Sequence, residues 1–150
     1  MKQYPPKIIV AWAEAISGNK TIRDWLTSNG YEELAAFTYA LNLQDDARKW
    51  LMDHGHRELM ALISGAEGDE KACIWLVKNH YEKLSLMAKG ADNDDEAITQ
   101  LLVNGHREWA MIALKMRAVK NDIQDDFDSL ILSKSAKLKQ SSLVSIINII

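Results

Sequence analysis

The chain has 150 residues, of which 47% are hydrophobic and 26% are charged, and its formal net charge at pH 7 is −3. These values are typical of one folded domain with an apolar core, and they exclude a disordered chain. A net acidic protein lacks the basic surface that binding to nucleic-acid phosphates requires, so no nucleic-acid partner is expected.

The first predicted element is a capping helix over residues 5–18. Proline is favoured at the start of a helix, and Pro5 and Pro6 precede an apolar run that contains Trp12. Glu14 interrupts this run, which makes it a poor secretory signal. No run of roughly 18 apolar residues occurs, so no transmembrane helix is expected. The single cysteine, Cys73, suits a reducing compartment, and we expect a cytoplasmic protein.

Four copies of one 25-residue unit follow, and they align without gaps as residues 19–43, 44–68, 69–93 and 94–118. The phrases WLTSNGYEEL, WLMDHGHREL, WLVKNHYEKL and LLVNGHREW stand at the same place in successive copies. One column of equivalent positions is apolar throughout and extends into the first helix: Trp12, Phe37, Leu62, Met87 and Ile112. A short unit that recurs at a fixed spacing indicates a stacked helical repeat.

Each unit is predicted to contain two short helices, which in the second copy cover roughly residues 45–54 and 56–64. Gly55 separates them, at a position where helices commonly end in a left-handed residue. His80 takes this place in the third copy, and we expect local strain there. The first helices should be capped by side chains at Asn19, Asp69 and Asp94, with Gln44 as the weak cap.

The sequence therefore predicts an all-α fold, an α-solenoid of about four helix pairs with atypical helices at both ends. One column alternates in charge as Glu32, Arg57, Glu82 and Arg107. Equivalent positions in adjacent repeats should lie about 10 Å apart. Ion pairs along this column are expected to accompany stacking.

Residues 121–133 resemble a divergent last repeat helix, and residues 134–150 are predicted to form a separate C-terminal helix. Its apolar face consists of Leu143, Ile146, Ile147 and Ile150, and it follows Lys134, Lys137 and Lys139. This helix could cap the last repeat, dock on a partner, or bind a membrane surface as a basic and apolar anchor.

The phrases HGHREL and NGHRE resemble the G-H-x-E phrase that joins the two helices of an ankyrin repeat. The resemblance covers the rhythm of residues 19–118 and the pairs Gly55–His56 and Gly105–His106. The 25-residue period is shorter than the ankyrin period of about 33 residues and leaves no room for the projecting hairpin. The T-P-L-H phrase is also missing. The resemblance implies an ankyrin-like short helical repeat that binds proteins.

The histidines, the acidic run and the tryptophans are residue types that can bind metals or ligands, but we expect structural roles for them here. His54, His56, His80 and His106 are expected at helix ends, because His56 and His106 would lie about 20 Å apart and could not share a metal ion. The acidic run at residues 92–96 lacks the glycine and glutamate of a calcium loop and is interpreted as a cap. The columns Trp25, Trp50 and Trp75 and the pair Trp12 and Trp109 are assigned to the core.

We expect a non-enzymatic protein–protein interaction or adaptor module, because stacked repeats build extended surfaces and no catalytic motif occurs. No catalytic, cofactor-binding or metal-ligating residue is proposed. The partner should be another protein, with a membrane surface as the alternative. Candidate partner-binding residues are those that vary between copies, namely Arg48, Lys49, Lys78 and Thr99 on the first helices and Thr38, Tyr39 and Lys89 on the second. Which face of the array binds does not follow from the sequence.

Overall fold

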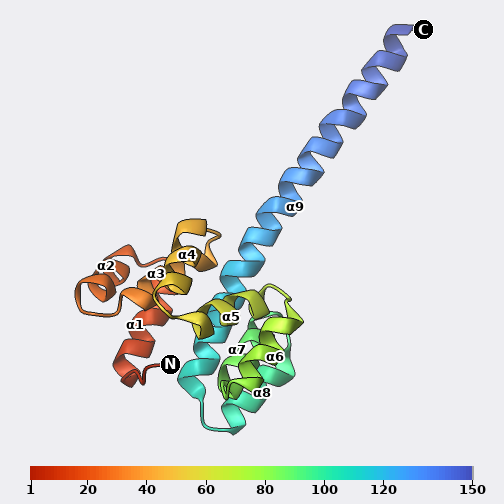
Figure 1. Cartoon of the computed structure of the whole chain (residues 1–150). Coiled ribbons are helices and arrows are strands. Elements are labelled where there is room, and N and C mark those ends of the chain that lie inside the picture. The colour runs from red at the N-terminus through yellow and green to blue at the C-terminus, as the bar shows by residue number, and fades with distance from the viewer. Residues whose placement is uncertain (150) are drawn as a thin grey trace. The chain divides into compact units, whose positions relative to one another are not determined.

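The computed structural model describes the backbone of residues 1–149 and the side chains of residues 1–134 (Figure 1). The described residues form helices joined by short turns and contain no strand, which confirms the predicted all-α class. The helices are α1 (Pro6–Ile16), α2 (Lys20–Ser28), α3 (Glu32–Leu41), α4 (Asp45–Asp53), α5 (Arg57–Ala66), α6 (Glu70–Lys78), α7 (Glu82–Ala91), α8 (Asp95–Val103) and α9 (Arg107–Ile149).

The chain divides into two compact units, Met1–Lys120 and Asn121–Ile150. Helix α9 begins in the first unit and supplies the second. It continues through residues 133 and 134, where a helix boundary was expected, so the described residues of the predicted elements 121–133 and 134–150, as far as Ile149, belong to one helix. The apolar face predicted for residues 143–150 lies outside the residues whose side chains are described.

Helix pairs recur at the 25-residue spacing of the sequence. We call α2, α4, α6 and α8 the A helices, and α3, α5, α7 and the first part of α9 the B helices. The predicted caps are confirmed at Asn19, Asp69 and Asp94, whose side chains accept backbone N–H groups at the starts of α2, α6 and α8. Gln44 makes no side-chain cap.

The ends of the A helices share a second repeated feature, a side-chain hydrogen bond followed by a residue with positive φ. The side chains of Asn29, His54 and Asn79 each hydrogen-bond the backbone carbonyl four residues earlier, at 2.7–2.8 Å. The next residue takes a positive φ, supplied by glycine at Gly30, Gly55 and Gly105. His80 has φ 65°, so the predicted left-handed strain in the third copy is confirmed.

The B helices hold most of the core. α3 buries seven residues, whereas α2 and α4 each bury only one, the leucine of the column Leu26 and Leu51. The predicted column Trp12, Phe37, Leu62, Met87 and Ile112 is fully buried. Successive B helices pack on one another, as in the contacts of α1 with α3, α3 with α5, and α5 with α7. Helices α2 and α4 therefore contribute only these two leucines to the apolar core.

The first and last B-type helices also meet. The Trp12 ring lies edge-on to Phe37 of the neighbouring α3 at 4.9 Å between centroids, and edge-on to Trp109 of α9 at 6.3 Å. A straight stack of helix pairs would separate α1 from α9 by several packing distances of about 10 Å each. The helix pairs of the first unit are therefore not arranged as a straight stack, which the repeat spacing alone did not predict.

The expected charge ladder does not form. Glu32, Arg57, Glu82 and Arg107 are exposed, and within residues 1–134 none of them is ion-paired with another. Exposed charges gain little from such pairing, about 0–1 kcal/mol, so the side chains remain solvated.

Candidate functional site

The A helices present an apolar row to solvent. We use the term apolar row for Met52, Val77 and Leu102, which occupy equivalent positions on α4, α6 and α8 and are 46%, 48% and 51% exposed. Ile74 on α6 and Val103 on α8 add further exposed apolar groups. Single exposed apolar residues are common on protein surfaces. Apolar residues exposed at equivalent positions of successive helices are a candidate interaction surface.

Three tryptophans on the A helices differ in how deeply they lie. Trp25 is 45% exposed, so its predicted core assignment is wrong, whereas Trp50 and Trp75 are half-buried and pack against the core. Each ring stacks on the aromatic residue six positions later. The pairs are Trp25 with Tyr31, Trp50 with His56, and Trp75 with Tyr81, at centroid distances of 6.4, 5.8 and 6.1 Å. The column of Tyr31, His56 and Tyr81 was the sequence signal for these pairs.

Three of the seven candidate partner-binding residues have internal roles. Thr38 is 1% exposed and donates to Ala35 O, which removes it from the candidate surface. Tyr39 lies under the guanidinium of Arg23, 4.7 Å from its ring centroid. Arg48 bonds Ala40 O and pairs with Glu67.

The other four candidates are exposed. Lys49 is ion-paired with Asp53 one turn later on α4, and Thr99 bonds Asp95 O within α8. Lys78 on α6 and Lys89 on α7 line the same cavity, so the structure brings these two together.

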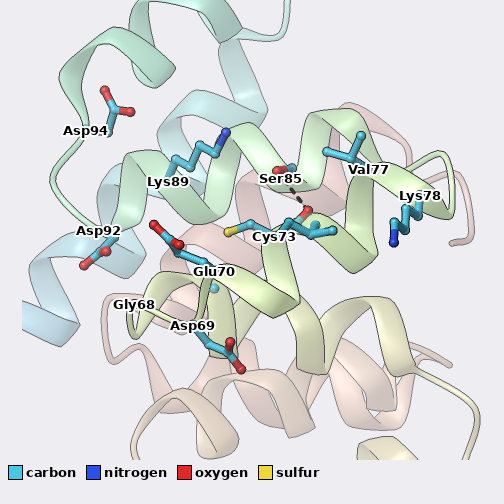
Figure 2. Close-up of a pocket in the computed structure, with 12 residues that line it drawn as sticks. Gly68, Asp69, Glu70, Cys73, Val77, Lys78, Ser85, Lys89, Asp92 and Asp94 are labelled. Carbon is cyan, nitrogen blue, oxygen red and sulfur yellow. Dashed lines mark hydrogen bonds between the residues drawn. The ribbon is translucent and has the colours of Figure 1, made fainter.

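This cavity has a volume of about 640 Å³ and lies beside α6 and α7, with Cys73 among its lining residues (Figure 2). Gly65, at the end of α5, lines it on one side; a Cβ there would lie only 2.9 Å from the sulfur of Cys73 and 2.8 Å from Ala88 Cβ. The missing side chain lets the helices approach closely. Ser85 Oγ donates to Cys73 O at 3.4 Å on the α7 side.

Charged groups surround the thiol. Burial is the main cause that raises the pKa of Cys73 above its ordinary value, and the carboxylates of Asp92, Asp69 and Glu70 raise this pKa further. The ammonium of Lys89 acts in the opposite direction. A thiol whose proton is held more tightly is a poor nucleophile near neutral pH, so the cavity offers a binding environment more than a catalytic thiolate.

A second cavity of about 490 Å³ is lined by Met1–Tyr4 and by residues of α7 and α9. Lys83 stands over the Trp109 ring, 4.0 Å from its centroid, and burial lowers the pKa of its ammonium. Tyr4 donates to the buried carboxylate of Glu33 at 2.8 Å. Burial and this hydrogen bond raise the pKa of Tyr4 well above its usual range. The sequence did not indicate that Glu33 is buried, because a glutamate in the first turn of a helix commonly lies at the surface.

None of the described helices is long and apolar enough to cross a membrane. The described side chains contain no group of three or more histidine, cysteine or acidic residues placed to hold a metal ion.

A scan against known protein families finds no matching family. Searches of curated proteins and of solved structures likewise find no match. The likeness to ankyrin repeats therefore rests on the sequence phrases alone.

Proposed function

We propose that the chain is a non-enzymatic protein–protein interaction module, built as a solenoid of four 25-residue helix pairs with capping helices, and that its A helices form the binding surface. The apolar row of Met52, Val77 and Leu102 carries this proposal. Repeat arrays bind partners with extended surfaces made of equivalent positions on successive units. Exposed apolar groups in such a line are typical of a surface that a partner covers.

The choice of the A helices is supported by what happens on the other side of the array. The B helices bury their apolar faces on one another, and the contact of Trp12 with Trp109 joins the first helix to the last. The candidates Lys49, Lys78 and Thr99 lie on A helices and are exposed, so they belong to the proposed surface as its polar part.

Substitution of the apolar row tests the proposal. Full-length protein would be used to capture partners from native lysate, and the most enriched partner would be purified and titrated. Met52→Glu with Leu102→Glu should weaken its binding by more than about tenfold, because two apolar contacts of the row are lost and charges are placed in the interface. Val10→Glu on α1, where Val10 is 48% exposed, is the matched control outside the A helices.

Equal affinity of the partner for the wild-type chain and the row variant would remove the A helices as the binding surface. Equal loss of binding in the row variant and in Val10→Glu would indicate a general effect of surface charge. Circular dichroism and the urea midpoint of each variant show whether the fold is intact.

A second candidate function is association with a membrane surface through the second unit. Phe127, Leu130 and Ile131 share one helical face and are 57%, 53% and 47% exposed, and Lys134 follows them. An amphipathic face of this kind binds lipid headgroup regions when basic residues flank it. Leu130→Asp with Ile131→Asp should abolish sedimentation with anionic vesicles, whereas Ser129→Asp should leave most of it. Absence of sedimentation for the wild-type chain would exclude this function.

A further inference from the structure

A groove of one kind recurs in the repeats, between an A helix and the end of the B-type helix before it. In the second repeat, Arg48 of α4 fills this groove. Its Nε donates to Ala40 O at the end of α3 at 3.0 Å, and its Nη2 lies 2.9 Å from Glu67 Oε1. A guanidinium group thus bridges a helix-terminal carbonyl and a carboxylate, the two kinds of acceptor that it binds best.

A guanidinium group also fills the equivalent place in the fourth repeat, whereas the arginine of the first repeat lies on an aromatic ring. Arg23, which is equivalent to Arg48, packs on the Tyr39 ring. In the fourth repeat Ile98 stands at the arginine position, and Arg117 enters from α9 instead. Its Nε donates to Gly90 O at 2.9 Å, and its Nη1 pairs with Asp95 at 2.7 Å. Gly90 is equivalent to Ala40, so the same carbonyl position is used twice.

The third repeat keeps the acceptors but has no arginine at this place. The position of Arg48 is taken by Cys73, the carbonyl position is that of Gly65, and the position of Glu67 is that of Asp92. A cysteine side chain is too short to span the groove, and its S–H is a weak donor. The cavity of about 640 Å³ lies here, and Gly65, Cys73 and Asp92 all line it.

The charge of the lining suits a cation. Four carboxylates line the cavity, those of Asp69, Glu70, Asp92 and Asp94, against the two ammonium groups of Lys78 and Lys89. Asp92 is already paired with Lys120 at 2.6 Å, and Asp69 and Asp94 cap helices. Within residues 1–134 Glu70 forms no ion pair, so its carboxylate is available to a bound cation.

The shape of the acceptors favours arginine over lysine. A planar guanidinium donates several N–H groups in a fixed fork and can reach a carbonyl and a carboxylate together, as Arg48 does, whereas an ammonium is a point charge. The apolar side chains of Ile74 and Val77, 53% and 48% exposed, stand at the same cavity. They provide apolar contact for the residue that adjoins the arginine.

We propose that the cavity at Cys73 receives the guanidinium group of an arginine side chain of a protein partner, in the place that Arg48 fills in the second repeat. The arginine adjoins an apolar residue that covers Ile74 and Val77. This inference rests on the proposed protein-binding function and names the side chain that the third repeat recognises. The volume lies within the range of roughly 300–1,000 Å³ that is typical of ligand pockets.

The test uses three fluorescein-labelled peptides of one sequence, acetylated and amidated at the ends, with arginine, lysine or citrulline before a leucine. Citrulline keeps the shape of arginine but has no charge. Fluorescence anisotropy with full-length protein should show arginine binding about tenfold more tightly than either substitute, the factor expected from one charge-assisted hydrogen bond. Backbone amide shifts in the wild-type protein should change among residues 65–94.

Substitutions in the protein provide the second arm. Cys73→Arg should abolish peptide binding, because it places the array's own guanidinium in the cavity. Val10→Arg adds the same charged group at an exposed position of α1 outside the cavity and should bind the peptides as the wild-type protein does. Glu70→Gln should weaken binding of the arginine peptide and leave that of the citrulline peptide unchanged. If Cys73→Arg does not fold, Glu70→Gln and the amide shifts of the wild-type protein still decide the outcome.

Equal binding of arginine and citrulline peptides, or amide shifts confined to other repeats, would overturn the proposal. So would unchanged binding to a folded Cys73→Arg protein. If the purified partner is lost on substitution of Met52 and Leu102 but retained by Cys73→Arg, the arginine site fails and the protein-binding function stands. If the peptides bind as expected while the row variant retains the partner, the proposed surface fails and the arginine site stands.

Discussion

Arg48 illustrates how one side chain can be given an internal role by its neighbours. Its position varies between copies, as expected for a partner-binding residue, yet its guanidinium bonds Ala40 O and pairs with Glu67. Only a quarter of the side chain is exposed, so solvent screens these contacts less than it screens a surface ion pair. The contacts therefore contribute to the stability of the second repeat.

Replacement of Arg48 by the residue of the third repeat tests that role. Arg48→Cys should lower the free energy of unfolding by about 1–2 kcal/mol, because a carbonyl and a carboxylate lose a charged donor. Lys49→Cys, at an exposed neighbour, should change it by less than about 0.5 kcal/mol. Urea denaturation measures both. Equal effects of the two substitutions would show that Arg48 contributes no more than a surface residue does.

Cys73 gives a pH dependence whose sign follows from its burial. The pKa of the thiol in the folded protein is raised above the ordinary value of 9.0. The folded state therefore holds the proton more tightly than the unfolded state does. This contribution to stability is complete below about pH 8 and is lost as the pH rises through the unfolded pKa toward the folded one.

The free energy of unfolding of the wild-type protein, minus that of Cys73→Ser, should be constant between about pH 6 and 8 and should fall from about pH 8 to 10. The serine variant removes the thiol and keeps every other titrating group, so the difference isolates Cys73. Urea unfolding curves at each pH measure it. A difference that increases with pH would mean that the thiolate is favoured in the folded protein.

At the scale of the helix, the starts of the A helices follow directly from the sequence. Asn19, Asp69 and Asp94 accept N–H groups of the first turn, whereas Gln44 at the equivalent place makes no such bond. Asparagine and aspartate are short enough to fold back onto the first turn, and glutamine has an additional methylene. The N–H groups in the first turn of α4 therefore have no side-chain acceptor at the cap, unlike those of the other A helices.

Gln44→Asn should raise the free energy of unfolding by about 0.5–1 kcal/mol, because it supplies the missing cap. Asparagine is chosen over aspartate because Asp45 and Asp46 follow and would repel another carboxylate. The reverse change, Asn19→Gln, is the matched control and should destabilise by a similar amount. Thermal unfolding measures both, and a loss of stability on Gln44→Asn would contradict the cap model.

Helix pairs, caps and the buried column were predictable because each depends on residues within one or two turns. The periodicity also assigned leucines to the buried face of the A helices. It misplaced Trp25, because a large ring beside a buried leucine can stack on an aromatic neighbour, here Tyr31, and remain half exposed. The cavity at Cys73 could be found only by comparing what fills one groove in successive repeats.

At the scale of the whole molecule, the departure of residues 1–120 from a straight stack was not predictable. It is the sum of small rotations between neighbouring helix pairs, each set by side-chain volumes at their contacts. Small residues at Gly65 and Gly90 permit close approach on one side: a Cβ at Gly90 would clash with Ile98 Cδ1, and one at Gly65 with Cys73 and Ala88. Repetition of such contacts brings Trp12 of α1 to Trp109 of α9.

This contact predicts that the two ends of the repeat array are energetically coupled. In an open array, each repeat interacts only with its neighbours, so loss of a side chain in α1 would loosen α1–α3 and leave α9 unaffected. Trp12→Ala removes a fully buried ring that touches both Phe37 and Trp109. It should cost about 3–5 kcal/mol and accelerate hydrogen exchange both in α3 and at the start of α9.

Hydrogen exchange followed by mass spectrometry can resolve these two ends, with the peptides from residues 32–41 and 107–116 as the critical pair. Val10→Ala, at an exposed position of the same helix, is the control for a change confined to the surface of α1. If exchange rises in residues 32–41 but stays unchanged in residues 107–116, the array behaves as an open stack, and the contact of Trp12 with Trp109 does not couple its ends. Faster exchange in both segments would show that the contact of Trp12 with Trp109 couples the two ends. A chain of nearest-neighbour contacts alone would loosen the helices next to α1 more than it loosens the start of α9.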